Sequence, residues 1–182
     1  MDGTSLKKQA GVTLVELITT LIVLAVLAGI ALPSMSGLMH RHRLQAAENE
    51  YIAILQYARS TAITDNTRII FCPSRDAQHC SNDGDWTQGW LVGRNLKGVD
   101  QPDGEPLRVG SPADRQLTIV STAGRQLVHF QSNGNADGSN LSLLFCYRGD
   151  SNDALSVVVA KSGRIRGAEA TNQQAANCAA AK

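Results

Sequence analysis

The feature that most constrains this chain is an apolar run of nineteen residues from Leu14 to Leu32, in which Glu16 is the only charged residue. A helix of that length measures about 28 Å, which is close to the thickness of a bilayer core. Lys7 and Lys8 precede the run, and basic residues there favour a cytoplasmic location for that end. The pattern predicts one membrane-spanning helix, with the rest of the chain outside the cytoplasm.

Two simpler interpretations of the run are an ordinary secretory signal and a plain membrane anchor. A secretory signal has an apolar region of about seven to fifteen residues, and Gly29-Ile30-Ala31 could serve as its cleavage site. Neither interpretation accounts for Glu16. A carboxylate inside a span costs on the order of 3 kcal/mol on insertion scales, so it usually has a specific partner.

Residues 7–17, Lys-Lys-Gln-Ala-Gly-Val-Thr-Leu-Val-Glu-Leu, resemble the class III signal of type IV pilins. The resemblance implies that a prepilin peptidase removes the leader 1–11 by cutting between Gly11 and Val12, and methylates the new amine of Val12. It also implies that Glu16 pairs with the N-terminus of a neighbouring pilin during filament assembly, which would satisfy both buried charges. Val12 departs from the pattern, since the family usually has Phe there.

By the same resemblance, residues 12–39 form a transmembrane and filament-core helix. The subunit would cross the inner membrane once, with residues 40–182 as a periplasmic domain, before it joins other pilins in a surface pilus. Four residues, His40 to Arg43, follow the predicted span, and we interpret them as a solvated or headgroup-facing collar rather than a ligand site.

The charge balance argues against an extended binding surface for nucleic acid. The formal net charge is +1, and loss of the leader would leave 15 basic and 15 acidic side chains. Any site for a polyanion must therefore be a local patch. Aromatic residues make up only 4% of the chain, which is too few for a base-stacking platform.

The hydrophobic pattern predicts an α+β fold. From Met39 to about Asn66, apolar residues recur at three- and four-residue steps, which indicates an amphipathic helix. Beyond it, short alternating segments and turn-rich clusters predict an antiparallel β region over residues 67–182. We expect a pilin-like fold in which the long helix packs on this sheet domain. The predicted strands are Arg68–Cys72, Gly89–Arg94, Leu107–Gly110, Gln116–Val120, Gln126–Gln131, Asn140–Arg148 and Leu155–Arg166.

Four cysteines form an even set without a C-x-x-C pair, which favours structural disulfides in an exported domain. Three pairings are possible, and we favour Cys72–Cys80 with Cys146–Cys178 because each closes the shorter available loop. On the chain-entropy model these bonds would contribute about 2.5 and 3.5 kcal/mol at most. The second bond would hold the tail Ala168–Lys182, whose composition otherwise indicates disorder.

Three segments of the β region resemble the GspH/FimT branch of minor pilins and pseudopilins: residues 85–92, 130–134 and 162–166. The last contains Gly163-Arg164-Ile165-Arg166, which is similar to the Gly-Arg-x-Arg element of FimT proteins that bind DNA in natural transformation. Ser162-Gly163 suits a two-residue hairpin turn that would place Lys161 opposite Arg164. Arg166 would then lie on the same side as Arg164.

The remaining residue patterns in the sequence give little support for catalysis or metal binding. No nucleotide-binding, zinc-protease or serine-hydrolase motif is present in the sequence, and the four histidines are not spaced as a triad or metal cage. We therefore predict no enzyme activity, cofactor or metal. Asn133, Asn135 and Asp137 resemble the start of a calcium loop, but Leu144 stands where its last acidic ligand belongs, so we favour a turn.

The resulting hypothesis is a minor type IV pilin that captures extracellular DNA. Lys161, Arg164 and Arg166 would contact phosphates without reading the sequence. The first alternative is a minor pseudopilin of a type II secretion system, with a structural role and no DNA binding. A second is an exported domain that binds an unknown protein.

Overall fold

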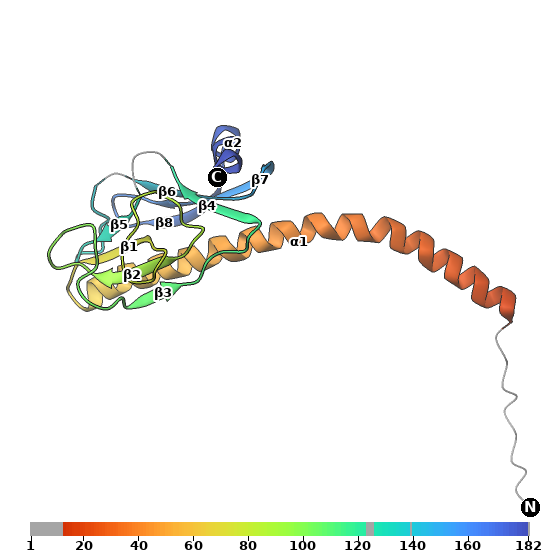
Figure 1. Ribbon diagram of the computed structural model, residues 1–182, viewed down its shortest axis with the longest axis horizontal. Helices are drawn as coiled ribbons and strands as arrows, with labels where there is room; N and C mark the ends of the chain where they lie inside the picture. Colours follow the sequence, from red (N-terminus) through yellow and green to blue (C-terminus); the bar gives the residue numbers. More distant parts are fainter. Residues whose placement is uncertain (1–12, 123–125, 139, 182) are drawn as a thin grey trace, which may run out of the picture. The chain divides into compact units, whose positions relative to one another are not determined.

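The computed structural model describes residues 13–122, 126–138 and 140–181, drawn as helices and strands in Figure 1. The chain divides into two compact units, residues 1–40 and 41–182. The leader predicted at residues 1–11 lies outside the described residues, and so do Gly11 and Val12 at the expected cleavage site.

The first unit contains the N-terminal part of helix α1, which extends from Leu14 to Thr64. Thr13 caps this helix: its hydroxyl accepts the N–H of Glu16 at 3.3 Å, and its carbonyl accepts the N–H of Leu17 at 3.1 Å. The large apolar side chains between Leu14 and Leu27 are about half exposed or more, so they do not belong to the core of the chain. In the part of the chain that the structure describes, no helix combines the length and apolar character needed to cross a membrane.

The second half of α1 carries the apolar stripe expected from the three- and four-residue spacing. Its members lie against strands of both sheets and form the main core of the second unit. The buried members are Leu44, Tyr51, Leu55, Ala58 and Ala62, and Ala47 is partly buried. The sequence pattern therefore identified the face of the helix that is covered.

The end of α1 is set by Asn66, which adopts the left-handed conformation with φ of 47°. The N–H of Asn66 donates to the carbonyl of Ile63 at 3.3 Å, and the N–H of Thr67 donates to that of Ala62 at 3.0 Å. These two bonds form a Schellman motif, in which asparagine is tolerated in place of glycine. The helix ends two residues before the expected boundary near Asn66.

Eight strands form two antiparallel sheets that both pack on α1 (Figure 1). The first sheet has the order β3-β2-β1-β5, and the second has the order β4-β6-β7-β8. This is the α+β arrangement predicted from the sequence. The strands are β1 (Ile69–Pro73), β2 (Trp90–Arg94), β3 (Arg108–Gly110), β4 (Leu117–Ser121), β5 (Val128–Phe130), β6 (Leu141–Tyr147), β7 (Asp150–Val159) and β8 (Ile165–Glu169).

Strands β1 to β6 match their predicted segments within two residues at each end. The segment Leu155–Arg166 instead contains the end of β7, a turn and the start of β8. The tail that we expected to depend on Cys178 alone forms helix α2 (Asn172–Ala180). Thr171 and Gln174 make a capping box at its start, a signal that the low hydrophobicity of the tail concealed.

Two disulfides join Cys72 to Cys80 and Cys146 to Cys178, the pairing that we favoured from loop lengths. Their Cα atoms are 5.5 Å and 6.1 Å apart, respectively. The second bond fixes α2 on β6, where both sulfur atoms are buried in a small cluster with Leu144. The disulfide thus supplies the anchor that the polar tail lacks.

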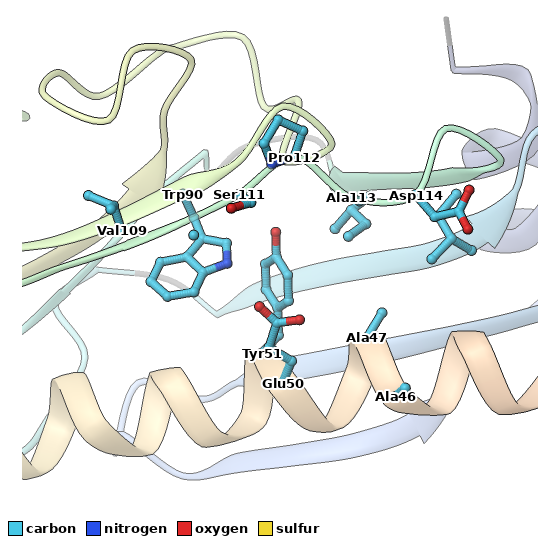
Figure 2. Close-up of a pocket in the computed structure, with 13 residues that line it drawn as sticks. Ala46, Ala47, Glu50, Tyr51, Trp90, Val109, Ser111, Pro112, Ala113 and Asp114 are labelled. Atoms are coloured by element: carbon cyan, nitrogen blue, oxygen red, sulfur yellow. The ribbon is translucent and has the colours of Figure 1, made fainter.

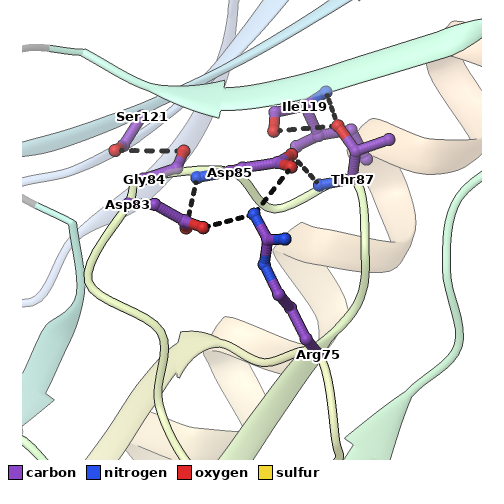
Figure 3. A network of polar contacts seen from close by, with 7 residues as sticks. All are labelled: Arg75, Asp83, Gly84, Asp85, Thr87, Ile119 and Ser121. Carbon is purple, nitrogen blue, oxygen red and sulfur yellow. Dashed lines mark hydrogen bonds and ion pairs between the residues drawn. The ribbon is translucent and has the colours of Figure 1, made fainter. Parts of the chain in front are cut away.

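The loop between β1 and β2 ties the two sheets together (Figure 3). Thr87 accepts the N–H of Ile119 on β4 at 3.0 Å through its hydroxyl, and the N–H of Trp86 donates to the carbonyl of Ile119 at 2.8 Å. Arg75 pairs with Asp83 at 2.5 Å and lies 3.8 Å from Asp85. Hydrogen bonds and ion pairs therefore hold the loop on both sides of the buried Trp86.

These contacts also account for the acidity of Asp83. Burial opposes ionisation of its carboxyl group, but the N–H of Asp85 and the Arg75 guanidinium outweigh that effect and hold the pKa of Asp83 below its usual value. The ionised form is the one that Arg75 binds, so the loop contacts in Figure 3 are made at neutral pH.

Candidate functional site

The hairpin between β7 and β8 carries the cations predicted to bind DNA, but its register differs from the expectation. Val159 pairs with Ile165, and the N–H of Ala160 donates to the carbonyl of Arg164 at 2.9 Å. The N–H of Gly163 donates to the carbonyl of Ala160 at 2.8 Å, and Gly163 has φ of 75°. The turn therefore has three residues and ends in a left-handed glycine, which is a common hairpin class.

The predicted two-residue turn is consequently wrong, and so is the placement of Lys161 opposite Arg164. Ala160 occupies the position opposite Arg164, while Lys161 lies in the turn itself. Arg166 pairs with Val158. Arg164 and Arg166 are two residues apart along extended chain, so we expect them to project from the same face.

All three hairpin cations are exposed, and none makes an ion pair with another described residue. Four other arginines of the domain pair with aspartates: Arg43 with Asp114, Arg68 with Asp137, Arg75 with Asp83 and Arg94 with Asp65. Arg41, Arg115 and Arg148 resemble the hairpin arginines in being exposed without an ion pair to a described residue. No carboxylate among the described residues therefore pairs with the three positive charges of the hairpin.

The loop between β5 and β6 supports the tip of this hairpin. The N–H of Ala136 donates to the carbonyl of Lys161 at 3.0 Å, and the N–H of Lys161 donates to Oδ1 of Asn140 at 3.1 Å. A Cβ atom on Gly163 would collide with the carbonyl oxygen of Gly134. Glycine at position 163 thus permits both the left-handed turn and the close contact between the two loops.

The same loop contains the residues compared with a calcium site. Oδ1 of Asn133 accepts the N–H of Asn135 at 2.9 Å, which is a side-chain turn. The carboxylate of Asp137 pairs with Arg68 at 2.7 Å. Among the described residues, no group of three or more His, Cys, Asp and Glu side chains lies together. The loop contains this turn, and its backbone contacts the hairpin through Ala136.

Arg59 on α1 is a cation of this region that the sequence analysis missed. Its Nε donates to the carbonyl of Gly134 at 2.8 Å, and its side chain also borders Gly163. In the sequence it occupies a polar position on an amphipathic helix, where a solvated charge is the ordinary interpretation. Only the contact between distant segments reveals its place beside the hairpin.

Glu48, also on α1, contacts the middle of β8, directly after Arg166. A Cβ on Gly167 would lie against its carboxylate, and the N–H of Ala168 donates to that carboxylate. Burial raises the pKa of Glu48, partly offset by this backbone bond. No ion pair joins Glu48 to a described residue, so it does not neutralise the hairpin arginines.

A pocket of about 440 Å³ lies between α1 and the segment after β3 (Figure 2). Tyr51 points into it from the helix, with Trp90 and Pro112 among the opposing residues. The Tyr51 hydroxyl donates to the carbonyl of Trp86 at 3.1 Å, and burial raises the pKa of Tyr51 well above its usual value. Tyr51 therefore stays protonated at neutral pH and serves as a hydrogen-bond donor in the wall of the pocket.

Glu16 lies in the first turn of α1, in the unit that contains the N-terminal helix. Its backbone N–H is held by Thr13, and the four residues Thr13-Leu14-Val15-Glu16 open the helix. The pairing of its carboxylate with the N-terminus of another subunit stays a prediction, since that partner amine belongs to a separate chain.

Comparison with protein families gives two matches. Residues 47–163 match the model described as type II transport protein GspH, and residues 6–32 match the prokaryotic N-terminal methylation motif. The first match ends at Gly163, immediately before Arg164. The two arginines of the hairpin therefore lie outside the matched region. Curated proteins give no significant match.

Solved structures with a similar fold include a type IV minor pilin and a minor pseudopilin. The type IV minor pilin FimU of Pseudomonas aeruginosa is 24% identical with a TM-score of 0.59, over 75% of this chain and 94% of that one. The minor pseudopilin EpsH from the type 2 secretion system of Vibrio cholerae is 11% identical with a TM-score of 0.52, over 70% of this chain and 97% of that one. Both likenesses concern the fold.

Proposed function

The chain belongs to the GspH family of pilin-like proteins, and on that premise we propose that it is a minor type IV pilin that binds DNA through the β7–β8 hairpin. Family membership makes it a minor pilin or pseudopilin: a structural subunit of a membrane-anchored, periplasmic or surface assembly that associates with other pilins. Its methylation motif implies prepilin processing. DNA binding is the step that the proposal adds.

One observation carries the DNA-binding proposal: Arg164 and Arg166 lie with Lys161 on one hairpin, and all three are exposed without an ion pair to any described residue. Uncompensated guanidinium groups at a rigid turn are suited to phosphate, because each can donate two parallel hydrogen bonds. Lys161 at the tip adds a third cation. Such contacts position a duplex without reading its bases, which suits uptake of DNA of any sequence.

The alternative is a minor pseudopilin with a purely structural role in type II secretion. The description of the matched family and the likeness to a pseudopilin fold favour it. In that case the hairpin would be an ordinary solvated turn and the domain would not bind nucleic acid. The two functions therefore differ in one measurable property.

The purified full-length chain in a non-ionic detergent should bind duplex DNA weakly, with a dissociation constant in the micromolar range or above at physiological salt. Three phosphate contacts contribute a slope of about −2.7 to log affinity against log salt. Fluorescence anisotropy with two duplexes of unrelated sequence should give similar affinities. If neither duplex binds even at low salt, the structural role in secretion becomes the better account.

A further inference from the structure

Arg59 is anchored beside the hairpin by only part of its guanidinium group. Its Nε–H donates to the carbonyl of Gly134 at 2.8 Å, and no other hydrogen bond from this side chain to a described residue is present. A guanidinium has five N–H donors in a planar fork. The four N–H groups of the two terminal nitrogens therefore stay available to a ligand.

The contact with the hairpin is close on the side of Gly163. A Cβ atom there would lie 2.8 Å from Nε of Arg59 and would collide with the carbonyl of Gly134. The guanidinium thus lies against the turn that contains Lys161, although α1 and the turn are about a hundred residues apart in sequence. Backbone contacts on both sides of the group restrict the directions in which it can point.

The aspartates of the supporting loop and of the end of α1 are engaged by other arginines. Asp137 in the supporting loop pairs with Arg68 at 2.7 Å, and Asp65 after the end of α1 pairs with Arg94 at 3.1 Å. Arg59 has no ion pair with the residues that the structure describes, although its side chain is partly buried. A partly buried cation without a carboxylate partner favours an anionic ligand.

We propose that Arg59 is a fourth phosphate-binding residue of the hairpin site, with its Nε fixed by Gly134 and its terminal nitrogens directed to the DNA backbone. This inference rests on the proposed DNA-binding function. Because the group is already held in place, little side-chain entropy is lost when it binds a phosphate. Gly167 faces α1, so Arg164 and Arg166 project from the opposite face of β8. The site therefore presents Arg59 on one side of the hairpin tip and the two β8 arginines on the other.

The test compares Arg59→Gln with wild type in the full-length chain, using a duplex DNA and a series of salt concentrations. A fourth contact makes the wild-type slope about −3.6, and Arg59→Gln should return it to about −2.7. The same relation predicts an affinity about eightfold lower at roughly 0.1 M salt. Arg148→Gln removes one exposed charge at the far end of β7 and should change affinity less than twofold.

A second variant separates contact from positioning. Arg59→Lys keeps the charge but loses the planar fork, so its salt slope should stay near the wild-type value. Circular dichroism must show that both variants are folded at the titration temperature. A wild-type slope near −2.7 that Arg59→Gln leaves unchanged would overturn the inference and leave the proposed function intact. Absence of DNA binding by the wild type would instead refute the proposed function.

Discussion

Replacing Trp86 with alanine should lower the free energy of unfolding by about 4 kcal/mol, within the usual range for a buried aromatic side chain. Trp86 is fully buried, with its ring centroid 4.7 Å from that of Phe71 and 6.1 Å from that of Tyr51. Its backbone also bonds to β4 of the other sheet. Alanine would leave a cavity where the two sheets and α1 meet. Urea denaturation followed by circular dichroism measures the loss.

Trp86→Phe is the matched control. It keeps an aromatic ring and removes an indole N–H that has no hydrogen-bond partner among the described residues, so the loss should be less than half that of the alanine variant. A change of less than about 1 kcal/mol for Trp86→Ala would contradict the account, because the loop would then contribute little to the core.

Replacing Gly11 with valine should abolish removal of the leader and leave a full-length protein that does not enter filaments. The match to the N-terminal methylation motif over residues 6–32 supports this expectation, although Gly11 itself lies outside the described residues. The residues that flank position 11 stay the same in this variant. Mass spectrometry of the protein from membranes and from sheared filaments measures both effects.

Val12→Phe introduces the residue that is usual in the family and should be cleaved normally. This variant tests whether any larger side chain beside the cleavage site blocks the peptidase. N-terminal sequencing of the wild type should begin at Val12 with a methylated amine. A first residue of Leu32 would identify an ordinary secretory signal and contradict the pilin interpretation of the N-terminus.

Much of the fold was predictable because its signals are local. The burial of Leu44, Tyr51 and Leu55 follows from helical spacing alone, since residues three and four apart share a face. Asn66 ends the helix through a conformation that asparagine tolerates. The strands before residue 148 are short alternating segments between turn residues, which is the pattern of half-buried sheet.

The hairpin register could not be predicted in the same way. Ser162-Gly163 suits a two-residue turn, but the left-handed Gly163 serves equally well as the last residue of a three-residue turn. In the structure, the tip contacts Gly134 and Ala136 of a different loop, which favours the longer turn. The place of Lys161 therefore depends on a tertiary contact rather than on its neighbours in sequence.

At the candidate site, the place of Arg59 could not be predicted from the sequence either. Nothing in the helical pattern separates it from other polar positions of α1, because its hydrogen bond to Gly134 joins segments 75 residues apart. The hairpin arginines were found by resemblance to a short motif. Their lack of carboxylate partners could be seen only once the ion pairs of the other arginines were placed.

The measurement that most directly tests the account is the DNA affinity of the double variant Arg164→Ala, Arg166→Ala. Loss of two phosphate contacts should weaken binding by about 60-fold at roughly 0.1 M salt and reduce the salt slope by about 1.8. Folding should be unaffected, since both side chains are exposed. The control Arg115→Ala, Arg148→Ala removes two exposed charges elsewhere on the domain and should bind nearly as well as wild type. Equal affinity of the hairpin variant and wild type would contradict the account and favour the structural pseudopilin role.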